Sequence, residues 1–279
     1  SLAAGVGIAS DGTFVDIVAD ERYCRIPGTT PGAEEDFSAI AWTQTPRIAL
    51  ISGTPHVIFQ DFDLEKLYYT YKDGTWQTPE LLSTNFFHQG DIINLAGTLR
   101  LLYARNTGPT QIVYREKVPP AAWGAESVLD TTQLNTDAVS LSGVGNTVLK
   151  AWSKHSNSTN RQLYYSIGEG NVLIPSTDIT KDQNPAALIN ADGSRVIVYE
   201  NHNADTDRAG IWAFVLEPTT DAYGTPEVSV NSGIPPIRAN AGDVQIGASG
   251  LVAPNGAPDV LFGKAATHVA SPPKAVVEV

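Results

Sequence analysis

An arginine and a glutamate on two successive strand-like runs give the first chemical expectation from this sequence. Arg100 belongs to the run LRLLY and Glu116 to the run IVYRE, with Tyr114 two residues earlier and Trp123 further on. A guanidinium offers a rigid fork of donors, a carboxylate offers acceptors, and an aromatic ring covers the apolar side of a sugar ring. These side chains therefore form a candidate saccharide site, with an ordinary structural ion pair beside core aromatics as the alternative.

Three further sets of side chains have the same chemistry elsewhere in the chain. They are Trp76 with Tyr69, Trp152 with Arg161 and Tyr165, and Trp212 with Arg195. Tyrosine and tryptophan also occupy protein cores, where the polar end of each ring finds a partner. Each set is consequently either a sugar site or a part of the packing between neighbouring sheets.

One loop places oxygen-bearing side chains at alternate positions, as calcium-binding loops do. Its residues are Asn201, Asn203, Asp205 and Asp207. The EF-hand pattern breaks after them, and turns rich in Asn and Asp are common without metal. We expect no cofactor, with Ca²⁺ at this loop as the alternative.

Composition narrows the class of partner. The chain has 279 residues and a formal net charge of -12, which disfavours the phosphate backbone of nucleic acids. No apolar run approaches the roughly 20 residues that span a bilayer, so we expect no membrane insertion. The sequence begins at Ser1 and contains no methionine, so we expect an N-terminus that was processed or engineered. We favour a secreted protein without setting aside a cytoplasmic one, and leave homo-oligomerisation open.

A turn followed by a β-rich run recurs six times and organises the chain. The runs read FVDIV, HVIF, LRLLY, VLKAW, RVIVY and DVLF. The turn glycines stand forty to fifty residues apart, except before the last copy, which follows a Pro/Gly/Asn-rich stretch. A period of this length is typical of four-stranded propeller blades. The units divide near residues 44, 87, 134, 182 and 234.

The second unit shows the expected blade most fully. We predict Ile48–Ser52 as the innermost strand, then His56–Gln60, then Lys66–Lys72, and Glu80–Thr84 as the outermost strand. The whole chain, residues 1–279, is then a single all-β domain: a six-bladed β-propeller of four-stranded antiparallel blades, with five or seven blades as alternatives. A β-sandwich with coincidental spacing is the competing fold.

The blade pattern resembles the six-bladed fungal and bacterial fucose-binding lectins, whose blades run LRxYxQ…IRE…GW. The likeness lies in the strand end Phe59-Gln60-Asp61, in Gly74…Trp76, and in the last unit, NGAPDVLFGKAATHVAS. Arg100 and Glu116 fall where that family has its sugar-clamping Arg and Glu. Arg195 matches this Arg in the fifth unit, whereas His56 stands in its place in the second.

The resemblance implies a carbohydrate-binding lectin with glycan or glycoconjugate partners and sugar pockets between or on the blades. We favour binding over catalysis. The alternative is a propeller-type glycoside hydrolase or polysaccharide lyase, and a protein-interaction scaffold without a small ligand is a third hypothesis. Sialidase chemistry has a weaker basis: the tripeptide Arg25-Ile26-Pro27, and Lys72–Trp76, which is faintly similar to an Asp box.

Overall fold

The computed structural model describes residues 6–40, 43–61, 64–132, 138–155, 161–167, 172–173, 182–189, 195–201, 210–216, 228–229, 249–252 and 258–261. Every regular element within these ranges is a β-strand, and no helix that could span a membrane occurs among them. The chain divides into two compact units, Ser1–Gln133 and Leu134–Val279. The single domain over residues 1–279 stays a prediction, and each unit is described here by itself.

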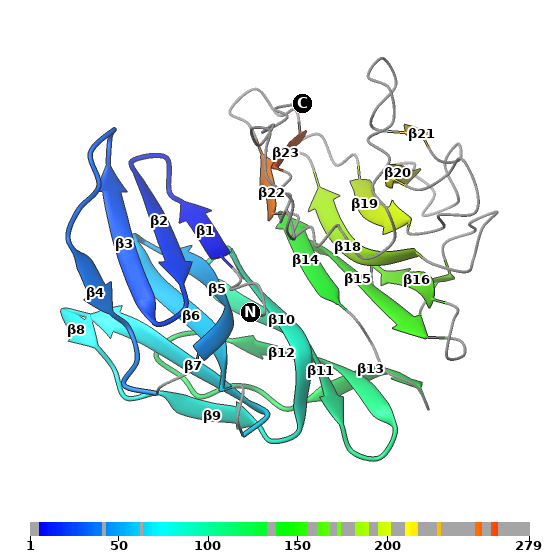
Figure 1. The fold of residues 1–279 in the computed structure, drawn as a ribbon, viewed down its shortest axis with the longest axis horizontal. Coiled ribbons are helices and arrows are strands. Elements are labelled where there is room, and N and C mark those ends of the chain that lie inside the picture. Colours follow the sequence, from blue (N-terminus) through cyan, green and yellow to red (C-terminus); the bar gives the residue numbers. More distant parts are fainter. Residues whose placement is uncertain are drawn as a thin grey trace, which may run out of the picture. The chain divides into compact units, whose positions relative to one another are not determined.

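The first unit contains three antiparallel sheets, each a meander in which consecutive strands pair (Figure 1). The first sheet is β1 (Val6–Ser10), β2 (Phe14–Ala19), β3 (Arg22–Pro27) and β4 (Glu34–Asp36). The second is β5 (Thr43–Ile51), β6 (Thr54–Asp61), β7 (Lys66–Asp73) and β9 (Glu80–Ser83), with the short β8 (Thr75–Trp76) also paired to β7. The third is β10 (Phe86–Leu95), β11 (Thr98–Asn106), β12 (Thr110–Lys117) and β13 (Ser127–Thr132).

The second unit repeats this order of pairing. The fourth sheet is β14 (Val139–Val144), β15 (Thr147–His155), β16 (Arg161–Ser166) and β17 (Val172–Leu173). The fifth is β18 (Asp182–Ile189), β19 (Arg195–Asn201), β20 (Gly210–Leu216) and β21 (Val228–Ser229). The described part of the chain ends with the hairpin of β22 (Ser249–Val252) and β23 (Pro258–Leu261).

The strands predicted for the second unit are confirmed. The innermost and outermost strands, β5 and β9, include or overlap the predicted ranges, and β6 and β7 extend theirs by one or two residues. Four of the five predicted divisions also fall within a few residues of the start of β5, β10, β14 or β18. The strand-and-turn pattern therefore located the repeat directly.

Tight hairpins connect the two innermost strands of these sheets. At Ser52-Gly53 and at Ala96-Gly97 both residues have positive φ, between 50° and 81°. Turns of this kind match the twist of the strands that they join, and glycine adopts the second position without a steric penalty. Such a turn therefore fixes the pairing register of the two strands, and the register decides the face on which each side chain lies.

Neighbouring sheets within each unit bury apolar side chains between them. Val18, Ile48, Val57 and Phe59 belong to a core shared by the first and second sheets. A second core joins the second and third sheets, and a third core joins the fourth and fifth. Four-stranded meanders that cover each other face to face are the blades of a β-propeller. The predicted fold class is confirmed, whereas the number of blades stays a prediction.

Candidate functional site

Three of the four residues predicted as a sugar site lie together on the third sheet. Arg100 on β11 is the cross-strand partner of Glu116 on β12, and Tyr114 lies opposite Leu102, two residues along. Arg100 Nη1 is 3.1 Å from Glu116 Oε1 and donates a hydrogen bond of 3.2 Å to the Tyr114 hydroxyl. That hydroxyl donates in turn to Glu116 Oε1 over 2.6 Å. The structure thus assembles an Arg–Tyr–Glu cluster as the sequence predicted.

The polar capacity of this cluster is only partly used. The Glu116 side chain is 47% exposed and that of Arg100 is 18% exposed. Arg100 Nε is buried without a hydrogen-bond partner among the described residues. Within that same part of the chain, Arg100 bonds through Nη1 and Glu116 accepts through Oε1. The guanidinium nitrogen Nη2 and the carboxylate oxygen Oε2 therefore have no hydrogen-bond partner within that part of the chain.

Tyr114 acts in this cluster as a neutral donor. Burial, followed by the hydrogen bond to Glu116, raises the pKa of the Tyr114 phenol above its ordinary value. A phenol with a raised pKa stays protonated at neutral pH and is a poor nucleophile. The geometry consequently suits hydrogen bonding to hydroxyl groups better than covalent attack by tyrosine.

Trp123, the fourth predicted residue, lies away from Arg100. It packs edge-on against Tyr69 of the second sheet, with ring centroids 5.3 Å apart and an interplanar angle of 88°. Leu99 and Leu101 share its core and alternate with Arg100 along β11, so Arg100 points to the other face of the sheet. Trp123 is therefore a packing residue between the second and third sheets.

Trp76 and Tyr69, predicted as a pair, also separate. Trp76 packs on Tyr23 and Phe37 of the first sheet, with ring centroids 5.1 and 5.8 Å apart. Tyr69 contacts Trp123, and its hydroxyl shares a hydrogen bond of 2.7 Å with His56 Nδ1. Each ring belongs to a different contact between sheets, so the two do not form one site.

The two tryptophan contacts follow one arrangement. Lys72 Nζ lies 5.4 Å from the ring centre of Tyr23, and Lys117 Nζ lies 5.3 Å from that of Tyr69. Each lysine also approaches a glutamate on the outer strand of the same preceding sheet, Glu35 at 2.7 Å and Glu80 at 3.9 Å. We call this set of Lys, Trp, Tyr and Glu the clasp, because one sheet uses it to hold the sheet before it.

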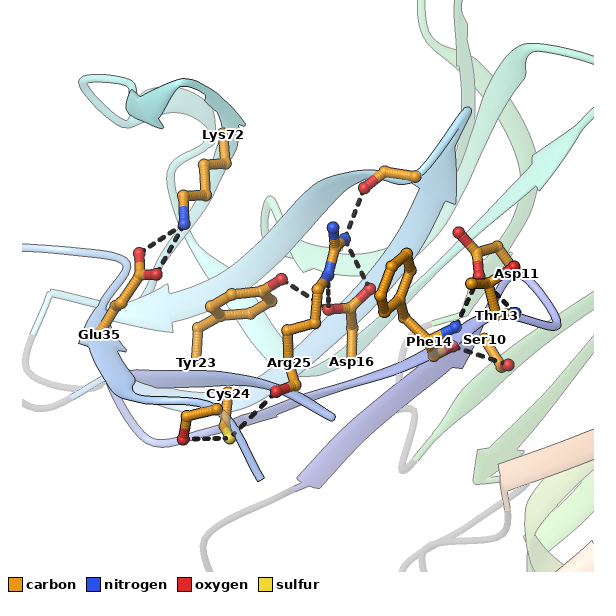
Figure 2. Close-up of polar contacts among 12 residues, drawn as sticks. Ser10, Asp11, Thr13, Phe14, Asp16, Tyr23, Cys24, Arg25, Glu35 and Lys72 are labelled. Atoms are coloured by element: carbon orange, nitrogen blue, oxygen red, sulfur yellow. Dashed lines mark hydrogen bonds and ion pairs between the residues drawn. The ribbon is translucent and has the colours of Figure 1, made fainter. Parts of the chain in front are cut away.

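Arg25, the basis of the sialidase hypothesis, is held within the protein. Figure 2 shows its guanidinium against the carboxylate of Asp16, which accepts bonds of 2.8 Å from Nε and 2.9 Å from Nη2. Nη2 also donates to the Gly53 carbonyl over 2.5 Å, and the Tyr23 hydroxyl donates to Asp16 over 2.5 Å. Asp16 is fully buried. A carboxylate of the protein thus occupies the place that a substrate carboxylate would need.

The register reveals an equivalence that the sequence did not show. Each of the first three sheets has a tyrosine on its third strand. The residue two positions further along that strand pairs with a residue on the second strand. We call the tyrosine and these two paired residues the tyrosine triad. The three triads of the first unit are Tyr23 with Asp16 and Arg25, Tyr69 with His56 and Tyr71, and Tyr114 with Arg100 and Glu116. In the fourth sheet Tyr165 keeps its place, but Leu149 and Ile167 make the other two positions apolar.

This equivalence confirms one motif match and corrects another. His56 does occupy the position of Arg100, as the sequence indicated. Arg195 does not, because it lies on the same face of β19 as Ile197 and Tyr199, which pack against the fourth sheet. Arg100 instead points away from the sheet that precedes it. A one-residue difference in register separates the two arginines onto opposite faces.

The remaining predicted residues fall partly outside the described chain. Trp212 lies on β20 opposite Tyr199, and Asn201 ends β19. Asn203, Asp205 and Asp207 lie outside the described residues, so the calcium hypothesis is untested. Among the described residues, no group of three or more His, Cys, Asp or Glu side chains is placed to hold a metal ion.

Comparison with known proteins supports the fold and leaves the family open. No protein-family model matches the chain, and no curated protein matches it. Among solved structures, hydrazine synthase from Kuenenia stuttgartiensis aligns with a TM-score of 0.64 at 9% identity, covering 93% of this chain and 73% of its own. An α-L-arabinanase from Penicillium chrysogenum, complexed with arabinobiose, aligns with a TM-score of 0.52 at 13% identity, covering 80% of this chain and 75% of its own.

A third similar structure, the xyloglucan PUL protein GH43B of Bacteroides ovatus, has a TM-score of 0.49 at 12% identity. It aligns with 82% of this chain, which spans 55% of its length. At these identities the likenesses show that the chain has the β-propeller scaffold, and the fucose-binding lectin remains a hypothesis about its use.

Proposed function

We propose that this protein acts on glycans and that Arg100, Tyr114 and Glu116 hold the hydroxyl groups of a sugar unit. The observation behind this proposal is the unused hydrogen-bonding capacity of the Arg100–Glu116 pair. The Arg100 side chain is 18% exposed and the Glu116 side chain is 47% exposed. Two adjacent sugar hydroxyls can each accept from an arginine and donate to a carboxylate oxygen. Charged partners make such hydrogen bonds stronger than neutral ones.

Cleavage of a glycosidic bond is the form of this function that the structural likenesses favour over binding without turnover. The Penicillium chrysogenum protein is an arabinanase, and it aligns with most of this chain. Most glycoside hydrolases use two carboxyl groups about 5–10 Å apart. Glu116 would supply one of them. Asp91 on β10 is the first acid to test as its partner, because it pairs with Leu102 and so shares the face of Arg100.

The third sheet offers a matched control for an experiment on Glu116. Arg105 Nη1 donates to Glu126 Oε2 over 2.5 Å, and the Tyr103 hydroxyl donates to Glu126 Oε1 over 2.7 Å. This second Arg–Tyr–Glu set has both carboxylate oxygens engaged. It lies on the face of β11 that packs against the second sheet, because Tyr103 belongs to that core. A substitution of Glu126 therefore tests whether any Arg–Tyr–Glu set affects glycan binding, or only the set that contains Arg100.

The test is a glycan array combined with turnover of arabino- and galacto-oligosaccharides, on the wild type, Glu116→Gln and Glu126→Gln. Glycan binding that is lost in Glu116→Gln and kept in Glu126→Gln supports the proposal. Turnover that disappears in Glu116→Gln or Asp91→Asn identifies a hydrolase, whereas binding without turnover identifies a lectin. A wild type that neither binds nor cleaves any glycan refutes the proposed function.

A further inference from the structure

The two clasps of the first unit close on tyrosines that have different hydrogen-bond partners. The first clasp, Lys72 and Trp76 of the second sheet, lies against Tyr23. The Tyr23 hydroxyl donates to Asp16, a fully buried carboxylate that also accepts two hydrogen bonds from Arg25. The buried acid behind the first clasp is therefore paired with a cation of its own sheet.

The second clasp closes on a tyrosine whose partner is a histidine. Lys117 and Trp123 of the third sheet lie against Tyr69, and the Tyr69 hydroxyl shares a hydrogen bond of 2.7 Å with His56 Nδ1. His56 has the register position that Asp16 has in the first sheet, and it is 3% exposed. A group that can become a cation therefore replaces a carboxylate behind the second clasp.

The charges that face His56 come from both sheets. Tyr71 stacks on it with ring centroids 5.6 Å apart, and Lys117 lies over the neighbouring Tyr69 ring. Glu80, the cross-strand partner of Tyr69, is 3.9 Å from Lys117 Nζ. The other titratable or charged side chains on these two faces, within the described residues, are Arg47, Asp73, Tyr103, Arg105, Arg115 and Glu126. Because Glu80 already balances Lys117, a proton on His56 would add an extra cation beside that pair.

We infer that His56 makes the second clasp a contact that acid opens, while the first clasp stays closed. A proton on the imidazole creates a charge in a side chain that is almost fully buried, next to the ammonium of Lys117. Separation of Lys117 and Trp123 from Tyr69 lets water reach that charge. The triad behind the first clasp contains no group that gains a positive charge, since its members are Asp16, Tyr23 and Arg25. This inference does not depend on glycan binding.

The difference in proton affinity between the closed and the open clasp sets the size of the effect. Burial, and then the charge of Lys117, lower the pKa of His56 to about 4, whereas a solvated imidazole has a pKa of 6.5. The open form therefore takes up the proton first as the pH falls. The ratio of open to closed molecules should rise about twentyfold from pH 7 to pH 5, a range in which ordinary carboxyl groups stay ionised.

Two equivalent backbone hydrogen bonds report on the two clasps separately. The residue after each clasp tryptophan is tied to the third strand of its own sheet. The Gly124 amide donates to the Glu116 carbonyl over 2.8 Å, and the Gln77 amide donates to the Tyr71 carbonyl over 2.9 Å. Hydrogen exchange of both amides in the full chain, followed by NMR and divided by the intrinsic exchange rate, measures the opening of each clasp. From pH 7 to pH 5 we expect Gly124 to lose about twentyfold in protection and Gln77 less than about twofold.

His56→Gln is the matched control, because an amide still pairs with the Tyr69 hydroxyl but takes up no proton. Its Gly124 protection should be the same at the two pH values. His56→Phe, which keeps a ring beside Tyr71, gives the same comparison if the glutamine variant is poorly folded. An equal loss of protection at Gln77 would show that acid loosens both clasps and would overturn the inference. Unchanged protection of Gly124 in the wild type, or an undiminished pH effect in both variants, would overturn the role of His56.

Discussion

The first and third sheets place a tyrosine, an arginine and an acid at the same three positions, with the arginine and the acid exchanged between strands. In the first sheet the three side chains are engaged with one another and with Gly53 of the next sheet. In the third sheet the acid is half exposed and part of the guanidinium is unused among the described residues. The same residue types are therefore buried and mutually bonded at one position of the repeat, and carry a half-exposed carboxylate at another.

The clasp accounts for much of this difference. Lys72 and Trp76 come from the second sheet and cover the triad of the first. A residue in a repeat consequently takes its role from the neighbour that packs on it as much as from its own sheet. Substitutions in clasp and triads should then change stability strongly where the triad is covered and weakly where it is exposed.

The largest expected effect is that of Trp123→Ala. Trp123 is 7% exposed and packs on Tyr69, so its removal leaves a cavity between the second and third sheets. We expect the free energy of unfolding to fall by about 3–5 kcal/mol, measured by urea denaturation. Trp123→Phe should lose clearly less. A Trp123→Ala variant of wild-type stability that no longer binds glycan would restore Trp123 to the sugar site.

Lowering the pH should lower the free energy of unfolding through His56, which lies in the second sheet beside its contact with the third. Burial, and then the charge of Lys117, lower the pKa of His56 to about 4 from the ordinary 6.5. Tyr69 and Tyr71 are the other polar groups beside it, and Glu80 lies 3.9 Å from Lys117 Nζ. The unfolded chain therefore takes up a proton before the folded chain does. Stability is complete above about pH 6.5 and falls by about 3 kcal/mol as the pH drops to 4.

Denaturation curves across that pH range, with His56→Phe as the control, measure this contribution. The variant should lose the part of the pH dependence that lies between pH 6.5 and 4. An identical pH profile in the two proteins would mean that other groups cause it.

Asp16→Ala should cause the next largest loss in the free energy of unfolding. It leaves the Arg25 guanidinium and the buried Tyr23 hydroxyl without their acceptor. Breaking a buried pair costs about 3–5 kcal/mol, and we expect about 2–3 here because Arg25 is 32% exposed. The surface pair Arg22–Asp36 is the control, and Asp36→Ala should cost less than about 1 kcal/mol. Equal losses in the two variants would remove the contrast between covered and exposed pairs.

Glu116→Gln should affect stability least and ligand binding most. Its carboxylate is half exposed, so we expect the free energy of unfolding to change by less than about 1 kcal/mol. Affinity for glycan should fall about tenfold or more, because a charged acceptor is lost. A large loss of stability, observed in thermal or urea unfolding, would make Glu116 a structural residue like Asp16.

Local sequence patterns predicted much of this fold. The glycine turns fixed the hairpins, and the β-rich runs His56–Gln60 and Lys66–Lys72 became β6 and β7 at nearly the predicted bounds. The Arg100–Glu116 pairing was predicted too, because two strands joined by a short loop can pair in few registers. These features depend on residues close together in the chain, and sequence alone determined them.

Packing between sheets decided which contacts each aromatic and charged side chain makes. Trp76 and Trp123 have the composition of sugar-binding residues, yet each closes a contact with the preceding sheet. Arg25 meets Asp16, and Arg195 lies on the opposite face from the Arg100 position. A side chain's exposure and its partners are set by segments distant in sequence and by a register in which one residue reverses the face. Tertiary structure alone therefore decided which of these acids is buried and which is half exposed.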